Sequence, residues 1–153
     1  NAKMNPPLRE EKDRLAIIKG LKDGTIDAIV TDHAPHTEEE KAKGLVSAPN
    51  GIIGFETALP ATITNLFVPG YIDYMDMVRL MSTRPAELLG LTDRGRIEEG
   101  YIADLTVFDP NKEYTYTKDM IVSKSKNTPW IGKKLKGEVE YTIVSGEIVY
   151  SKK

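Results

Sequence analysis

The chain has 153 residues, of which 40% are hydrophobic and 29% are charged, and its formal net charge at pH 7 is −2. This composition is typical of a globular protein with an ordinary core, and the charge argues against nucleic acid as a partner. The absence of cysteine excludes disulfides and thiolate metal sites. With no apolar run of about 18 residues and no signal-peptide core, we expect a cytoplasmic protein without membrane spans.

The chain is predicted to begin with an extended loop followed by a helix. Asn-Pro-Pro at residues 5–7 disfavours helix, and Asn5 taken alone is a typical turn residue. An amphipathic helix is predicted over residues 9–21. Gly20 and Gly24 bracket its expected end.

A short strand is expected next, with polar residues at its end. Residues 28–30, Ala-Ile-Val, predict a strand buried on both faces, and Pro35 cannot continue a ladder because it has no N–H. Asp32, His33 and His36 therefore lie at the carboxyl end of a buried strand. In α/β proteins with parallel strands, ligands bind there.

These three side chains suit the chemistry of a metal-dependent hydrolase. A carboxylate and an imidazole supply an anionic metal ligand, a proton acceptor near neutral pH and a hydrogen-bond donor for an anion. A single aspartate at such a position has a purely structural role, as a helix cap or turn former, about as often as a functional one. One acid and two histidines do not complete a metal site.

The middle of the chain reads as helices separated by turns. Thr37 is expected to cap a short helix, and the charged residues 38–41 favour a solvated face. Turn residues at 47–51 predict a loop over the strand end. Longer helices are predicted over residues 55–68 and 73–89, with their methionines in the core.

The second of these helices contains a proline near its end. Pro85 is expected in the first turn of a separate short helix that Gly90 stops. Arg84 is expected to brace a helix end and is assigned no catalytic role.

Beyond residue 90 the pattern changes from helical to β. Short strands separated by turn residues are predicted over residues 95–100, 103–110 and 138–150. Ser145-Gly146 predicts a hairpin turn. We therefore divide the chain into residues 1–90 and an all-β part, residues 91–153, for which a structural role is the simplest interpretation.

Six motifs extend across nearly the whole chain. They are Lys-Met-Asn-Pro-Pro-Leu-Arg (3–9), Thr-Asp-His-Ala-Pro-His (31–36), Gly-Ile-Ile-Gly-Phe-Glu-Thr-Ala-Leu-Pro (51–60), Ser-Thr-Arg-Pro-Ala (82–86), Gly-Arg-Ile to Ala-Asp-Leu (95–105) and Ser-Lys-Asn-Thr-Pro-Trp (125–130). Together they resemble the carboxyl-terminal part of bacterial-type dihydroorotases, in the amidohydrolase superfamily. The resemblance implies an α/β fold, with the terminal portion of a metal-dependent hydrolase β/α (TIM-like) barrel followed by part of a small β-sandwich domain.

The resemblance also implies an activity and a set of site residues. Dihydroorotases carry out the zinc-dependent, reversible hydrolysis of the cyclic amide of dihydroorotate to carbamoyl-aspartate, in de novo pyrimidine biosynthesis. Asp32 matches the zinc ligand that also transfers the proton. His36 and Asn5 match substrate-binding residues, and Asn50-Gly51 matches a loop whose backbone contacts the substrate. The commoner family pattern has phenylalanine at position 50, so an apolar lid role of that ring is lost here.

The zinc site that the resemblance implies is incomplete in this chain. The His-x-His pair, the bridging acidic ligand and the two later histidines of the family have no counterparts, and His33 matches no ligand position. Since zinc needs about four ligands, we expect one or two Zn²⁺ ions whose other ligands lie outside this chain. The chain alone is then an inactive fragment. Expected partners are the remaining part of the enzyme, the small-molecule substrate and further copies in a homo-oligomer.

Two alternatives remain open. Another cyclic amidase of the superfamily, a hydantoinase or an allantoinase, would share the barrel end and the sandwich, although Asn5, Asp32 and His36 together favour dihydroorotase. The other alternative is a non-catalytic, dihydroorotase-like structural or interaction subunit, in which Asp32 is only a cap.

Overall fold

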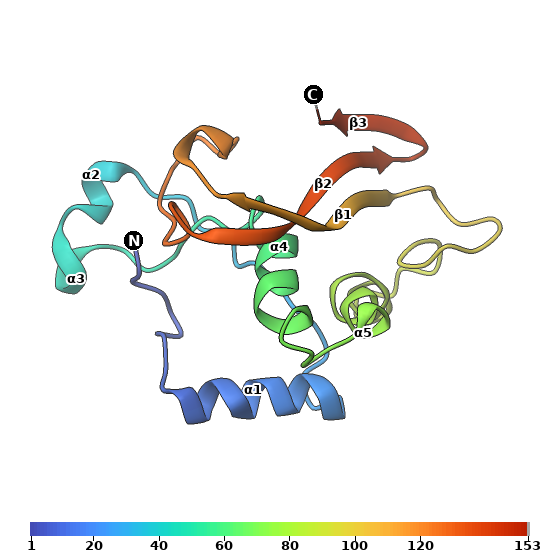
Figure 1. The fold of residues 1–153 in the computed structure, drawn as a ribbon, viewed down its shortest axis with the longest axis horizontal. Coiled ribbons are helices and arrows are strands. Elements are labelled where there is room, and N and C mark those ends of the chain that lie inside the picture. The colour runs from blue at the N-terminus through green and yellow to red at the C-terminus, as the bar shows by residue number, and fades with distance from the viewer. Residues whose placement is uncertain (153) are drawn as a thin grey trace.

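A three-stranded antiparallel sheet lies over a layer of helices in the computed structural model, which describes residues 1–152 (Figure 1). The helices are α1 (Glu11–Asp23), α2 (Glu38–Lys41), α3 (Gly44–Ser47), α4 (Ala58–Thr62), α5 (Tyr74–Val78) and α6 (Arg84–Leu88), with π-helical turns at Ile63–Phe67 and Arg79–Thr83 and a 3₁₀ turn at Lys118–Met120. The strands are β1 (Leu105–Thr115), β2 (Lys134–Val144) and β3 (Glu147–Ser151).

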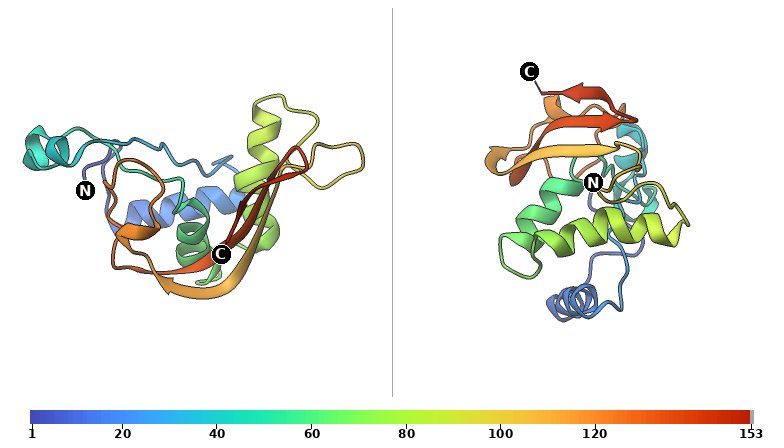
Figure 2. Two further views of the ribbon diagram at one scale, coloured as in Figure 1. Left: turned by 90° about the horizontal axis from the view of Figure 1, so that it is seen from above. Right: turned by 90° about the vertical axis from the view of Figure 1, so that its right-hand side faces the viewer.

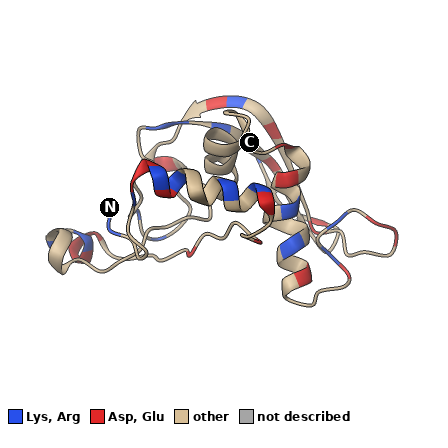
Figure 3. Cartoon of the chain, turned by 90° about the horizontal axis from the view of Figure 1, so that it is seen from below, with Lys and Arg blue, Asp and Glu red and all other residues tan. Residues whose placement is uncertain are grey.

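The helical layer has its own apolar core. Leu21 of α1 packs with Ile63, Met77 and Leu80, all at most 4% exposed, so α4 lies between the sheet and α1 (Figures 1 and 2). The helix predicted over residues 9–21 is confirmed two residues further along. Lys and Arg are interspersed with Asp and Glu on α1 (Figure 3), as expected for a solvated helix face.

The helix ends follow local chemistry. Gly24, at φ 80°, caps α1 in the left-handed conformation that glycine adopts without strain. Gly20, by contrast, lies inside the helix, where a Cβ would press on Ile26. The Thr37 hydroxyl accepts from the Glu40 amide at 3.1 Å, which confirms the predicted cap of α2.

Pro85 lies in the first turn of α6, as predicted, although α6 is not separated from the helix before it. One helix runs without interruption from Tyr74 to Leu88, through α5, the π turn Arg79–Thr83 and α6. Pro85 has no N–H and its ring crowds the preceding turn, and the π turn lies immediately before it, where the i→i+5 pattern accommodates the proline. Asp73 caps the helix through the Asp76 amide at 2.8 Å.

The strand predicted at residues 28–30 is not formed. Residues 27–37 have no ladder partner, and Val30 is 78% exposed. Ile29 donates its amide to the Leu80 carbonyl at 2.9 Å. A parallel strand becomes regular only between neighbouring strands, and no segment within residues 1–152 lies alongside this one as a strand.

The β part is a single sheet with the order β1-β2-β3. Ser145 and Gly146 both have positive φ, 51° and 84°, as a two-residue type I′ hairpin requires, which confirms the predicted turn. Residues 95–100 form a loop, so the strand predicted there is wrong. Within the described residues there is one three-stranded sheet, and the second layer of a sandwich is not formed by them.

The sheet and the helices meet closely at one point. Gly137 of β2 has φ 95°, and a Cβ there would collide with Ile63. Glycine thus lets β2 lie directly against the π turn that follows α4.

No helix in the described part of the chain has the length and hydropathy needed to cross a bilayer.

Candidate active site

The site is built where the extended segment 31–36 lies beside residues 50–54. The Ala34 amide donates to the Ile52 carbonyl at 2.9 Å, and Gly54 approaches Thr31 so closely that a Cβ would be crowded. Two polar segments of the chain, predicted as a strand end and as a loop over it, are therefore side by side.

Asp32 presents its carboxylate at the surface of this segment. The residue is exposed, with φ 44°, an unusual backbone conformation for a residue other than glycine. Among the described residues, none donates a hydrogen bond to this carboxylate. An exposed anionic oxygen donor fits a divalent cation, although no three His, Asp or Glu side chains within residues 1–152 are grouped as a metal site.

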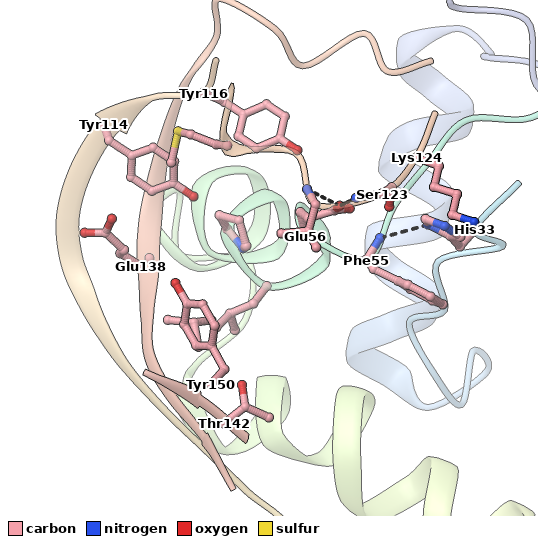
Figure 4. Close-up of a pocket in the computed structure, with 16 residues that line it drawn as sticks. His33, Phe55, Glu56, Tyr114, Tyr116, Ser123, Lys124, Glu138, Thr142 and Tyr150 are labelled. Carbon is pink, nitrogen blue, oxygen red and sulfur yellow. Dashed lines mark hydrogen bonds between the residues drawn. The ribbon is translucent and has the colours of Figure 1, made fainter. Parts of the chain in front are cut away.

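His33 holds the neighbouring loop. Its Nδ1 accepts the amides of Gly54 at 3.1 Å and Phe55 at 3.4 Å, so the neutral ring carries its proton on Nε2. The ring stacks on Phe55 with centroids 3.9 Å apart. Figure 4 shows the two residues and the hydrogen bond from the Phe55 amide. His33 therefore fixes residues 54–55 against the segment 31–36.

His36 contacts the predicted substrate loop directly. Its Nε2 lies 2.9 Å from the Asn50 carbonyl, and because a carbonyl only accepts, Nε2 carries the proton. Its Nδ1 is 3.7 Å from a Glu40 carboxylate oxygen. Two of the residues proposed to bind substrate, His36 and Asn50, are thus in contact.

Both backbone polar groups of Gly51 are hydrogen-bonded. Its amide donates to the Lys3 carbonyl at 2.9 Å, and its carbonyl accepts from Lys41 Nζ at 3.0 Å and Asn127 Nδ2 at 3.2 Å. Asn5 follows Lys3 by two residues and is exposed. The amino-terminal segment with Asn5 is therefore anchored beside Gly51.

Asn127 and Lys41 are site residues that the sequence did not indicate. Asn127 belongs to the β part, within the motif at residues 125–130, yet its buried side chain contacts Ala34, His36 and Gly51. Lys41 was interpreted as part of a solvated face, which is wrong, since its ammonium donates to three carbonyl oxygens. Burial lowers the pKa of Lys41, and the nearby Lys3 ammonium lowers it further. The motif at residues 125–130 was the only signal that could have indicated Asn127.

A groove of about 660 Å³ lies between the sheet and the start of α4. Of the strand-end residues, only His33 lines it, so it is separate from Asp32 and His36. Glu56 accepts the amides of Ser123 and Val122 there (Figure 4). Burial raises the pKa of Tyr116 to about 12, and its hydroxyl lacks a hydrogen-bond partner among the described residues.

Known proteins match the chain over nearly its whole length. The dihydroorotase of Clostridium acetobutylicum is 51% identical over 153 residues, which are 100% of this chain and 36% of that protein. The dihydroorotase of Clostridioides difficile is 52% identical over 99% of this chain and 35% of its own length. The chain thus spans about a third of the length of these curated relatives.

Solved structures agree on the fold. The L-hydantoinase (dihydropyrimidinase) from Arthrobacter aurescens superimposes with a TM-score of 0.91 and 30% identity, over 98% of this chain and 34% of the hydantoinase. Residues 4–149 match the amidohydrolase family. Because this match covers nearly all of the sequence, the chain belongs to the amidohydrolase family.

Proposed function

We propose that this chain is the carboxyl-terminal part of a dihydroorotase, which interconverts dihydroorotate and carbamoyl-aspartate in pyrimidine synthesis. The observation that carries the proposal is the 51% identity to a dihydroorotase over all 153 residues, against 30% to a hydantoinase of the same fold. We further propose that residues 1–90 complete a β/α barrel and that residues 91–153 contribute to a β-sandwich. The protein would act in the cytoplasm as a homo-oligomer.

Asp32 is the residue to which we assign the chemistry. Its exposed carboxylate would be one ligand of zinc, with the other ligands supplied from outside this chain. When bound, zinc supplies Lewis-acid polarisation and lowers the pKa of a bound water to about 7. In the hydrolytic direction, the Asp32 carboxylate takes one proton from the attacking water and returns it to the amide nitrogen as the ring opens. Ring closure follows the same proton path in reverse.

The substrate carboxylate is assigned to the cluster around His36. An imidazole N–H is a donor suited to an anion, and the Nε2–H of His36, which donates to the Asn50 carbonyl at 2.9 Å, would turn from that carbonyl to the substrate. Asn5 and the Asn50-Gly51 loop are assigned to the same carboxylate. The enzymatic role is favoured over a purely structural one by the 51% identity to a dihydroorotase, and the site assignments proposed here follow from that role.

The test is a substitution of Asp32 in the full-length protein. Asp32→Asn keeps the size of the side chain but removes the proton acceptor, so kcat for dihydroorotate hydrolysis is expected to fall by about 10²–10⁴-fold. Asp119→Asn, which removes an exposed carboxylate outside the site, is the matched control and should retain activity. Unchanged turnover in Asp32→Asn, with the fold intact by circular dichroism, would contradict the role assigned to Asp32, whereas a folded wild-type protein without turnover would support the structural or interaction subunit.

A hydantoinase is the second candidate, because hydantoinase structures share this fold with TM-scores of up to 0.91. Comparing kcat/KM for dihydroorotate with kcat/KM for hydantoin separates the two. A higher value for dihydroorotate is expected, because the residues around His36 bind a carboxylate that hydantoin lacks.

A further inference from the structure

The carbonyl oxygen of Gly51 is the meeting point of two side chains that no catalytic assignment uses. Lys41 Nζ approaches it at 3.0 Å and Asn127 Nδ2 at 3.2 Å. A carbonyl oxygen has two lone pairs, so its capacity is filled by these two donors. The orientation of the Gly51-Ile52 peptide is therefore set by side chains from two distant parts of the chain.

Lys41 uses its three N–H donors on backbone oxygens. Besides Gly51, its ammonium contacts the Pro49 carbonyl at 2.9 Å and the Lys3 carbonyl at 3.3 Å. A charged donor makes stronger hydrogen bonds than a neutral one. Lys41 thus ties the loop before Gly51 to the amino-terminal segment that carries Asn5.

Asn127 ties the same loop to the strand end. Its side chain is 3% exposed, and Nδ2 donates to the Ala34 carbonyl at 2.9 Å as well as to Gly51. Its Oδ1 accepts the His36 amide at 3.1 Å, and its own carbonyl accepts the Ile53 amide at 3.1 Å. Every polar atom of this buried carboxamide is therefore used to hold residues 34–53 together.

We infer that Lys41 and Asn127 are positioning residues that hold Gly51, and through it the neighbouring Asn50 carbonyl and the His36 ring, in the geometry that binds the substrate carboxylate. The inference rests on the proposed function. Neither residue needs to touch the substrate. The Gly51-Ile52 peptide, whose oxygen these side chains hold, shares the Gly51 Cα with the Asn50-Gly51 peptide, and His36 Nε2 bonds to the Asn50 carbonyl. A rotation about the backbone of Gly51, which has φ 117°, therefore moves the Asn50 carbonyl and the His36 ring together. Displacements of about 1 Å at such groups are enough to weaken binding strongly.

The experiment uses the full-length, metal-loaded protein with three variants. Lys41→Met keeps the aliphatic stem and removes the donors. Asn127→Asp keeps the shape but replaces Nδ2 with an oxygen that faces two carbonyls. Lys43→Met removes the same charge from an exposed neighbour and is the matched control. The measurements are kcat and KM for dihydroorotate, and hydrogen exchange of the amides in residues 44–53.

We expect Lys41→Met to raise KM about tenfold or more, which corresponds to the loss of a charge-assisted hydrogen bond, while kcat changes less because Asp32 is untouched. Amides 44–53 should exchange faster in Lys41→Met and Asn127→Asp, and Lys43→Met should match the wild type in both measurements. If Asn127→Asp fails to fold, Lys41→Met alone decides, since Lys41 is only half-buried.

Three outcomes would overturn the inference. The first is Lys41→Met with unchanged KM, whether or not the loop exchanges faster, because that leaves at most a structural role. The second is a raised KM without faster exchange, which would place the ammonium on the substrate itself. The third is an equal effect of Lys43→Met, which would indicate a general charge effect. Should the wild-type protein not hydrolyse dihydroorotate, the proposed function fails. The exchange data still test separately whether Lys41 and Asn127 hold residues 44–53.

Discussion

Asp32 combines an exposed carboxylate with a left-handed backbone, at φ 44°. This conformation costs most residues about 1–2 kcal/mol relative to the right-handed regions, and aspartate tolerates it better than most. Residues held in such regions are concentrated at functional sites, where the surrounding structure imposes the geometry. The backbone at this position is therefore fitted to the placement of the carboxylate and not to stability alone.

Substituting Asp32 should separate backbone strain from chemistry. In the full-length protein with metal removed by a chelator, Asp32→Gly is expected to be more stable than Asp32→Ala by about 1 kcal/mol, because glycine adopts positive φ without strain. Both variants should lack turnover. Thermal or urea unfolding measures the difference, and an alanine variant as stable as the glycine variant would show that φ at this position relaxes freely.

At the scale of elements, Glu56 joins the helical layer to the β part. Its Oε1 accepts the amides of Ser123 at 2.7 Å and Val122 at 3.1 Å. Burial raises the pKa of Glu56, but the hydrogen bonds from Ser123 and Val122 lower it by more, so the pKa lies below its ordinary value of 4.5. The ionised carboxylate is thus the form that links the segment before α4 to the chain after the 3₁₀ turn.

This link predicts a pH dependence of stability. Because the folded pKa is lowered, the contribution of Glu56 is fully present above pH 4.5 and is lost as the pH falls through the lower folded value. Glu56→Gln should therefore lower the free energy of unfolding by about 1.5 kcal/mol at pH 7 and by less under more acidic conditions. Urea titrations across pH 3–7 of the full-length protein check this. Glu99→Gln, at an exposed position, should show no such trend.

At the scale of the whole chain, several large apolar side chains remain uncovered. Val46 is 93% exposed, Ile97 90%, Val122 85% and Val30 78%. The segment at residues 27–37 has no ladder partner either. Exposed apolar side chains and unpaired backbone of this kind are usually covered by another part of a protein or by a second chain. The curated relatives are longer, since this chain spans 36% of the dihydroorotase of Clostridium acetobutylicum.

The isolated 153-residue chain should consequently self-associate and bind zinc only weakly. Asp32 is the one ligand assigned to zinc here, whereas a zinc site needs about four. Light scattering after size-exclusion chromatography should detect oligomers or aggregates, and a zinc titration followed by calorimetry should show no stoichiometric tight site. A monomer that binds zinc tightly or hydrolyses dihydroorotate would contradict the assignment of the remaining ligands to other polypeptide.

The sequence by itself determined most of the helices, the hairpin and the family. Helix periodicity, the caps at Thr37 and Asp73 and the Ser145-Gly146 turn depend on residues a few positions apart, so local chemistry specifies them. The motifs were sufficient for the family, because a shared ancestry is recorded in the order of residues and not in their contacts.

Only the tertiary structure decided how the site is held together. Asn127 lies 93 residues from Ala34 and 76 from Gly51, and no periodicity in the sequence links positions so far apart. The same reason explains the wrong strand at residues 28–30, since a strand depends on neighbours that local sequence cannot supply. Burial of Lys41 and the contact between His36 and Asn50 likewise follow from how the chain returns on itself, which only the folded molecule specifies.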